Sequence, residues 1–208
     1  ASLRRLLPSR IRAGFTWKTI DEAAAGETPA GLISIRTQSR IPAGWLPSLR
    51  GVITRSTGYD HIHRLWSESG IPVPAGYLPL YCNRAVAEQA MLLWMALLRR
   101  LPAQNRQVIS FDRDGLTGLE CAGRTLVVFG VGNIGHEAAR IGLGLGMSVL
   151  GVDPVRRHAD VQYVSAEEGL AKAEILVCAM NLTPLNTGFF HYGRMKRCRP
   201  GVFFINVA

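Results

Sequence analysis

The sequence is short of cysteine and carries no cysteine motif. Its 208 residues include four cysteines, which stand singly at positions 82, 121, 178 and 198 without a C-x-x-C pair. Isolated thiols exclude a dense disulfide framework, and they are typical of proteins kept in a reducing compartment. We therefore expect a cytoplasmic location.

Long apolar runs and metal-binding patterns are also missing from the sequence. The longest uninterrupted apolar run covers residues 90–98, far fewer than the roughly 18 residues that a membrane-spanning helix needs. His61 and His63 stand close together, but no thiolate or second ligand pair lies near them in the sequence. We therefore expect neither a membrane partner nor a bound metal.

Lysine is scarce and occurs only at positions 18, 172 and 196, although the formal net charge is +9. The charge comes from arginines scattered along the chain, and the densest basic cluster is residues 194–199. Surfaces that bind nucleic acid usually show a basic stripe interleaved with aromatic residues, and the sequence has no such stripe. We therefore predict no nucleic-acid partner. A basic field of this kind also attracts small anions, which gives the positive charge another use.

The most informative feature that is present is a glycine motif between two apolar runs. Residues 125–129 form an apolar, β-branched run that predicts a buried strand, and a helical stretch begins with residues 136–139. A second apolar run, residues 147–152, ends at Asp153. Between the first run and the helix stand three glycines with G-x-G-x-x-G spacing, Gly130, Gly132 and Gly135.

Each glycine of this motif meets a different physical need. Gly130 allows a tight turn, Gly132 lets the backbone approach a pyrophosphate, and Gly135 lets the helix pack closely on the strand. The N–H groups at the start of the helix then face the phosphates. Asp153 is placed at the end of the second strand, where it can accept hydrogen bonds from a ribose diol. The combination predicts a dinucleotide-binding site.

The rest of the chain predicts further alternation of strands and helices. Expected strands cover residues 31–35, 51–54, 174–179 and 202–207, expected helices cover residues 60–70, 83–100, 166–173 and 192–197, and residues 103–124 form a polar connection. Apolar strands that alternate with helices indicate an α/β fold with a parallel, doubly wound sheet.

A proline- and glycine-rich segment, residues 74–79, is the best candidate for a hinge. We place the domain boundary just after it, which gives domains of residues 1–82 and 83–208. The helix that opens the second domain has no polar residue between Gln89 and Arg99, so its surface is apolar nearly all round. Such a helix is buried within the chain or packs against another subunit.

Six motifs follow one another in order: RSTGYDHI (55–62), IPVPAGY (71–77), AVAEQAMLL (85–93), GRTLVVFGVGNIG (123–135), GMSVLGVDP (146–154) and GVFFINVA (201–208). Together they resemble the D-isomer-specific 2-hydroxyacid dehydrogenase family, from about residue 31 to the last residue. The resemblance implies a Rossmann-type doubly wound sheet for residues 83–208 and a flavodoxin-like substrate domain for residues 1–82. It also implies an active site in the cleft between the domains, NAD as the cofactor and a homodimer as the assembly.

The resemblance carries roles over to individual residues. Thr57 and Gly58 match the loop whose backbone N–H groups hold the substrate carboxylate. Besides the three glycines, the positions that match the cofactor site are Val86 near the nicotinamide, Asn133 and Ile134 on the pyrophosphate, Asp153 on the adenosine ribose, and Met180, Val207 and Ala208 along the adenine and the nicotinamide ribose. For Met180 and Val207, plain packing is an equal alternative.

Cofactor choice is expected to follow the charge at the end of the second strand. Asp153 would repel the 2′-phosphate of NADP, which favours NAD. Arg156 and Arg157 lie just beyond it in the sequence and would partly neutralise that phosphate.

The implied activity is hydride transfer between the nicotinamide and a small D-2-hydroxy acid or 2-keto acid. In the family, the Arg that orients the substrate directly follows the INVA motif, and a Glu and the proton-exchanging His come later. The sequence ends at Ala208, before all three, and His191 aligns to the start of a surface helix instead. We therefore expect no catalytic residue in this chain, a C-terminally incomplete sheet, and no activity for these 208 residues alone.

Two other functions fit part of this pattern. A non-catalytic, NAD-sensing scaffold of the co-repressor type resembles the same family, and the residues after Ala208 would separate it from an enzyme. A free-standing Rossmann domain of another enzyme class is disfavoured, because residues 51–93 also match the family.

Overall fold

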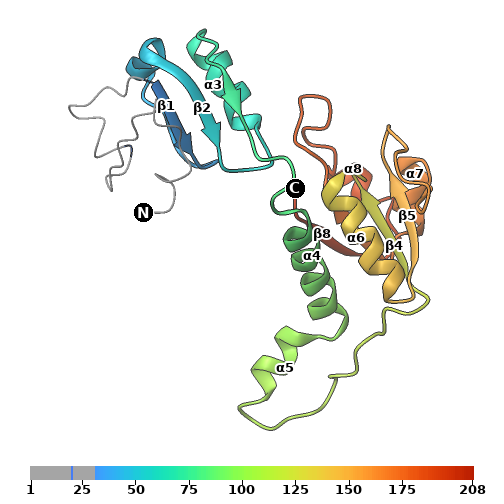
Figure 1. The fold of residues 1–208 in the computed structure, drawn as a ribbon. Coiled ribbons are helices and arrows are strands. Elements are labelled where there is room, and N and C mark those ends of the chain that lie inside the picture. Colours follow the sequence, from blue (N-terminus) through green and yellow to red (C-terminus); the bar gives the residue numbers. More distant parts are fainter. Residues whose placement is uncertain (1–19, 21–30) are drawn as a thin grey trace. The chain divides into compact units, whose positions relative to one another are not determined.

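Figure 1 shows the computed structural model, which describes residue 20 and residues 31–208. The chain divides into two compact units, residues 1–78 and residues 79–208. Each unit has its own sheet and its own core. Except for residue 20, the first thirty residues of the predicted substrate domain lie outside the described part of the chain.

The first unit is built on a small parallel sheet. Its strands are β1 (Gly31–Ile35), β2 (Leu49–Thr54) and β3 (Ala75–Gly76), in that order across the sheet. The 3-10 helix η1 (Ala43–Ser48) and the helix α3 (Asp60–Ser69) connect these strands. The core of the unit consists of Ile35, Trp45, Leu46, Leu49, Val52, Ile62 and Val73.

The second unit is built on a five-stranded parallel sheet in the order β6-β5-β4-β7-β8. The chain starts in the middle of the sheet, moves outward through two strands, and then returns to the other side of the first one. Doubly wound sheets bind ligands at such a reversal, outside the carboxyl ends of the strands. The strands are β4 (Thr125–Phe129), β5 (Ser148–Val152), β6 (Gln162–Tyr163), β7 (Ile175–Cys178) and β8 (Phe203–Asn206).

The helices of this unit are α4 (Asn83–Leu98), α5 (Leu101–Gln107), α6 (Asn133–Gly144), α7 (Ala166–Lys172) and α8 (Tyr192–Met195). Helices α4 and α6 cover one face of this sheet, helix α7 covers the other, and α5 extends beyond the end of α4 (Figure 1). On β4, Leu126 and Val128 pack into one core with residues of α4 and α6, whereas Val127 and Phe129 pack into a second core with α7. Because side chains alternate along a strand, this arrangement requires a helical layer on each side. It confirms the predicted doubly wound α/β fold.

Several element ends differ from the sequence prediction by one or two residues, and two larger differences have a cause in the backbone. Helix α5 occupies part of the segment 103–124 that we expected to be a polar connection, and it starts after Arg100, which turns the chain with φ 55°. Helix α6 starts at Asn133 rather than His136, because Gly132 adopts the extended conformation of an N-cap.

Helix α4 buries one face rather than its whole circumference. Its buried residues are Ala87, Ala90, Trp94 and Leu98, whose spacing of three and four follows one side of a helix. Its exposed leucines are Leu92, Leu93 and Leu97. None of the described helices is long and apolar enough to cross a membrane.

Candidate dinucleotide site

The glycine turn that joins β4 to α6 is tightly constrained at two positions and open at the third. Gly130 has φ +85°, and a Cβ on it would lie 2.7 Å from the Met180 Cα. A Cβ on Gly135 would collide with the Gly130 carbonyl oxygen. A Cβ on Gly132 would meet no described atom within 4 Å. Gly130 and Gly135 are therefore required by backbone packing, whereas Gly132 leaves space outside the turn.

The start of α6 borders this space. The first N–H groups of a helix have no intrahelical acceptor, and no side chain caps α6 at Gly132. Asn133 and Ile134 are the first two residues of the helix. Their uncapped N–H groups and the positive end of the helix dipole together suit an anion.

Asp153 ties this turn to the end of β5. Its Oδ2 accepts a hydrogen bond from the Val131 N–H (2.8 Å), and its Oδ1 accepts one from the Val155 N–H (2.8 Å). A carboxylate has about four lone-pair positions, so it can accept further bonds from a ribose. Arg156 and Arg157, which follow in the loop, are exposed.

The parallel register brings the remaining predicted residues to the same edge of the sheet. The last residues of β4, β5, β7 and β8 are in register, because Phe129 pairs with both Val152 and Cys178, and Cys178 pairs with Asn206. Met180, Val207 and Ala208 come just after these strand ends, as does the glycine turn. Met180 and Val207 are partly buried and pack against the two cores, which fits the packing alternative, and Ala208 is exposed.

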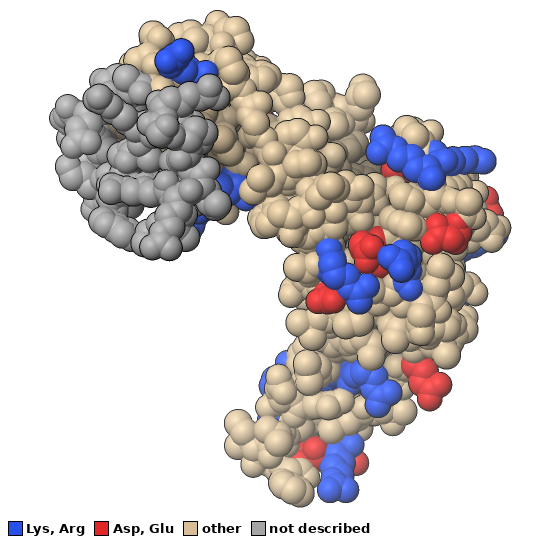
Figure 2. All heavy atoms as spheres, in the orientation of Figure 1, with Lys and Arg blue, Asp and Glu red and all other residues tan. Residues whose placement is uncertain are grey.

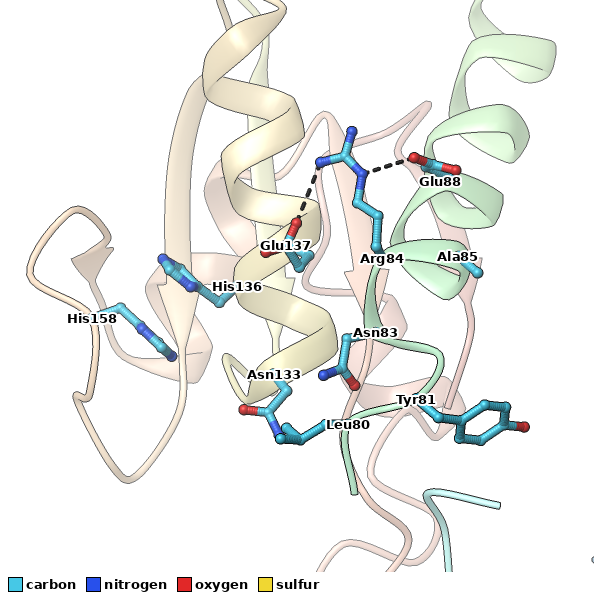
Figure 3. Close-up of a pocket in the computed structure, with 10 residues that line it drawn as sticks. All are labelled: Leu80, Tyr81, Asn83, Arg84, Ala85, Glu88, Asn133, His136, Glu137 and His158. Carbon is cyan, nitrogen blue, oxygen red and sulfur yellow. Dashed lines mark hydrogen bonds and ion pairs between the residues drawn. The ribbon is translucent and has the colours of Figure 1, made fainter. Parts of the chain in front are cut away.

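A hollow of about 730 Å³ opens beside the start of α6. It is lined by residues of the segment 80–88, by the first turn of α6 and by His158, as Figure 3 shows. The Oδ1 atom of Asn83 is buried there without a hydrogen-bond partner in the described part of the chain. Val86 lies one turn along in α4 and is partly buried, but it does not line the hollow.

Arg84 stands at the rim of this hollow between two helices. Its Nε donates to Glu88 Oε1 on α4 (2.8 Å), and its Nη1 donates to Glu137 Oε2 on α6 (3.3 Å; Figure 3). Figure 2 shows other basic side chains in separate groups, several of them beside acidic ones. Exposed ion pairs of this kind add little stability. The absence of a nucleic-acid partner stays a prediction.

The predicted substrate loop lies in the first unit, directly after β2. Thr57 donates from Oγ1 to the Leu78 carbonyl (3.1 Å), and Gly58 is exposed. Ser56 Oγ donates to the Gly58 carbonyl (2.7 Å) and also lies 2.6 Å from the Oγ1 of Thr54, which is fully buried. The Gly58 carbonyl is therefore linked through the Ser56 hydroxyl to the buried hydroxyl of Thr54.

The direction of these hydrogen bonds follows from the number of protons available. Ser56 gives its single hydroxyl proton to Gly58, so it must accept from Thr54, and Thr54 must then accept from His61 Nε2 (2.9 Å). The Nδ1 of His61 is buried without a partner among the described residues. Burial lowers the pKa of His61, Asp60 raises it, and Arg64 lowers it further. We conclude that His61 is a neutral donor with its proton on Nε2.

Sequence reasoning missed this use of His61. From the sequence, His61 could be assessed only as a metal ligand. A histidine in a helical stretch gives no sign that it will contact the hydroxyl of Thr54, seven residues earlier.

The described residues of the second unit fit a dinucleotide. Gly132 leaves a cradle that a side chain would fill, the start of α6 is uncapped, and the Asn83 amide oxygen lacks a partner beside it. An anionic pyrophosphate suits the helix terminus, and a ligand hydroxyl or amino group would satisfy the oxygen.

Comparison with known proteins agrees with this geometry. A family model described as the NAD-binding domain of D-isomer specific 2-hydroxyacid dehydrogenases matches residues 91–208. A 2-hydroxyacid dehydrogenase homolog of Haemophilus influenzae is 31% identical over 164 residues, which cover 76% of this chain and 49% of that protein. The D-lactate dehydrogenase of Escherichia coli is 31% identical over 137 residues, which cover 63% of this chain and 42% of that protein.

A solved structure of a D-lactate dehydrogenase also resembles this chain. The D-lactate dehydrogenase from Aquifex aeolicus, complexed with NAD and lactic acid, aligns with a TM-score of 0.76 at 28% identity. The alignment covers 84% of this chain and 55% of that one. The chain thus spans about half the length of the proteins that it matches.

Proposed function

Because the chain belongs to the D-isomer-specific 2-hydroxyacid dehydrogenase family and carries its NAD-binding domain, we propose that it is part of an NAD-dependent oxidoreductase. The substrate would be a small D-2-hydroxy acid or the corresponding 2-keto acid. The observation that carries the proposal is the turn at Gly130, Gly132 and Gly135, which is closed by packing at two positions and open at the third.

In this proposal the second unit binds and orients NAD. The uncapped N–H groups of Asn133 and Ile134 receive the pyrophosphate, and Asp153 accepts hydrogen bonds from the adenosine ribose. Val86, Met180, Val207 and Ala208 line the rest of the cofactor. When bound, NAD supplies the hydride acceptor or donor at its nicotinamide C4.

The first unit would hold the substrate carboxylate through the loop at Thr57 and Gly58. The chain of bonds from His61 through Thr54 and Ser56 fixes the Gly58 carbonyl, and it thereby restrains the loop that carries the Thr57 and Gly58 N–H groups. A fixed peptide group is a better anion donor than a mobile one, because no ordering is needed when the substrate binds. None of the 208 residues is assigned to proton exchange, and we expect residues 1–208 alone to show no turnover.

We also propose that the protein is a homodimer and works in the cytoplasm. Leu92, Leu93 and Leu97 are exposed on one face of α4, and the α5 region that follows exposes Val108, Ile109 and Phe111. Large apolar side chains exposed on successive elements favour an interface with another subunit. The cytoplasmic location is supported by the four cysteines, which stand singly in the sequence without a C-x-x-C pair.

Steady-state kinetics on the enzyme that contains these residues tests the activity. With NADH and a panel of 2-keto acids, we expect reduction of at least one acid to its D-2-hydroxy acid. Saturable NADH binding without turnover of any acid would favour the non-catalytic scaffold instead.

A further inference from the structure

Three potential metal ligands converge beside α6. His136 lies in the first turn of that helix, whereas His158 and Asp160 lie in the loop between β5 and β6. The Nε2 of His136 is 2.9 Å from each carboxylate oxygen of Asp160. The rings of His136 and His158 stack with centroids 3.6 Å apart and planes 9° apart. One ligand atom from each residue lies within 4.8 Å of the other two.

The backbone holds these side chains in place. His158 and Asp160 belong to one turn, which is closed by a hydrogen bond from the Val161 N–H to the His158 carbonyl (3.3 Å). The His158 N–H donates to the Tyr163 hydroxyl (3.3 Å), which fixes the start of the turn to β6. His136 is fixed by α6, whose Ala138 and Ala139 are fully buried.

An ion pair between His136 and Asp160 leaves the position of His158 unexplained. Two imidazoles stacked face to face repel each other when both are charged, so at least one must be neutral and able to act as a ligand. Partial burial and then the neighbouring His136 lower the pKa of His158, and the hydrogen bond from His136 lowers the pKa of Asp160.

The donor set determines which ion would fit. Imidazole nitrogens and a carboxylate oxygen suit Zn²⁺ and similar divalent transition ions, with bonds of about 2.0–2.2 Å. Such bonds require the ligand atoms to lie closer together than 4.8 Å. They also require the two rings to rotate out of their parallel stack, because an imidazole binds an ion in its own ring plane. The side chain of Asp160 is 49% exposed, so rotation about its side-chain bonds can adjust the carboxylate without displacing buried residues.

We propose that His136, His158 and Asp160 form a site for a divalent transition ion, Zn²⁺ in the first instance. The ion ties the first turn of α6 to the loop that follows Asp153. Three protein ligands leave a coordination position for water or a small anion. The two histidines also line the hollow beside Asn133, so this position is accessible (Figure 3). The site was not expected from the sequence, and it does not depend on the proposed function.

Titration of the metal-free protein with Zn²⁺, in competition with a chromophoric chelator, tests the site. We expect one ion per chain. His136→Ala, His158→Ala and Asp160→Asn should each weaken Zn²⁺ binding by at least about tenfold, the lower end of the loss caused by removing an outer-sphere partner of a metal site. Asp160→Asn is nearly isosteric and exposed, so far-UV circular dichroism should show an unchanged fold.

His191→Ala is the matched control, because His191 is an exposed histidine outside the cluster, and it should leave Zn²⁺ affinity unchanged. Co²⁺ provides a second readout, since its visible absorption should appear with the wild type and disappear with Asp160→Asn. The proposal is overturned if no saturable binding occurs or if the three variants bind Zn²⁺ like the wild type. It is equally overturned if blocking the cysteines, rather than changing the cluster, removes the binding.

Discussion

The backbones of Gly130 and Met180 touch where β4 and β7 end, so closely that a Cβ on Gly130 would lie 2.7 Å from the Met180 Cα and N. These strands are neighbours in the sheet, but the chain reaches β7 only after passing through β5 and β6. The contact therefore lies at the reversal point of the doubly wound sheet, and it holds the glycine turn against the next strand end.

Gly130→Ala should lower the free energy of unfolding of the second unit. The left-handed conformation alone costs about 1–2 kcal/mol for an L-residue, and the collision with Met180 adds to this. Gly144→Ala is the matched control, because a Cβ there meets no described atom within 4 Å, and alanine should stabilise the helix by up to about 1 kcal/mol. Urea unfolding measures both changes, and equal stabilities for the two variants would contradict the packing described.

Removal of the charge at Asp153 should shift cofactor preference towards NADPH. Asp153→Asn keeps an acceptor oxygen but loses the charge that repels a 2′-phosphate, so the affinity for NADPH relative to NADH should rise at least about tenfold. Asp153→Ala should also destabilise the turn, because the bonds from Val131 and Val155 are lost. Dissociation constants for both cofactors measure the shift. Wild-type protein that binds NADPH as tightly as NADH would refute the assignment.

The stability of the first unit should fall in mild acid because of His61. Its pKa in the folded state lies below its ordinary value of 6.5, so below that pH the unfolded state binds more protons. The contribution is complete above about pH 6.5 and is lost as the pH falls, with a slope of at most about 1.4 kcal/mol per pH unit. His61→Gln retains an amide donor but cannot titrate, so it should flatten the slope in urea unfolding between pH 5 and 7. An unchanged slope would rule out this role for His61.

Leu97→Glu should convert the proposed dimer to a monomer. The substitution puts a charge in the exposed apolar face of α4 without changing the buried face at Trp94. Leu185→Glu is the control, because Leu185 is 99% exposed and does not belong to that helix. Sedimentation velocity should give a dimer for the wild type and for Leu185→Glu. A monomeric wild type would contradict the proposal.

The sequence was sufficient to predict the parts of the fold that depend on local chemistry. The apolar run 125–129, the glycine spacing and Asp153 identified the strand, turn and acid, because each requirement acts within a few residues. The doubly wound fold, the family and NAD as its cofactor are confirmed by the structure and the comparisons.

Features that depend on contacts between distant segments could not be predicted in this way. His136 meets Asp160 across 24 positions of sequence, and periodicity says nothing about such a distance. Gly142 lies inside helix α6 against Leu126 of β4, where a Cβ would collide with the leucine side chain, and the sequence does not show this long-range contact. The apolar character of α4 did not reveal which face the chain itself buries.

The most direct test of the central claim is the affinity of the protein for NADH with and without a side chain at Gly132. Gly132 has ordinary extended dihedral angles and open space around it, so Gly132→Val should leave the fold and its free energy of unfolding nearly unchanged. In a fluorescence titration, the wild type should bind NADH saturably, Gly132→Ala more weakly, and Gly132→Val not at all. NADH binding by folded Gly132→Val with wild-type affinity would show that the dinucleotide does not lie on this turn.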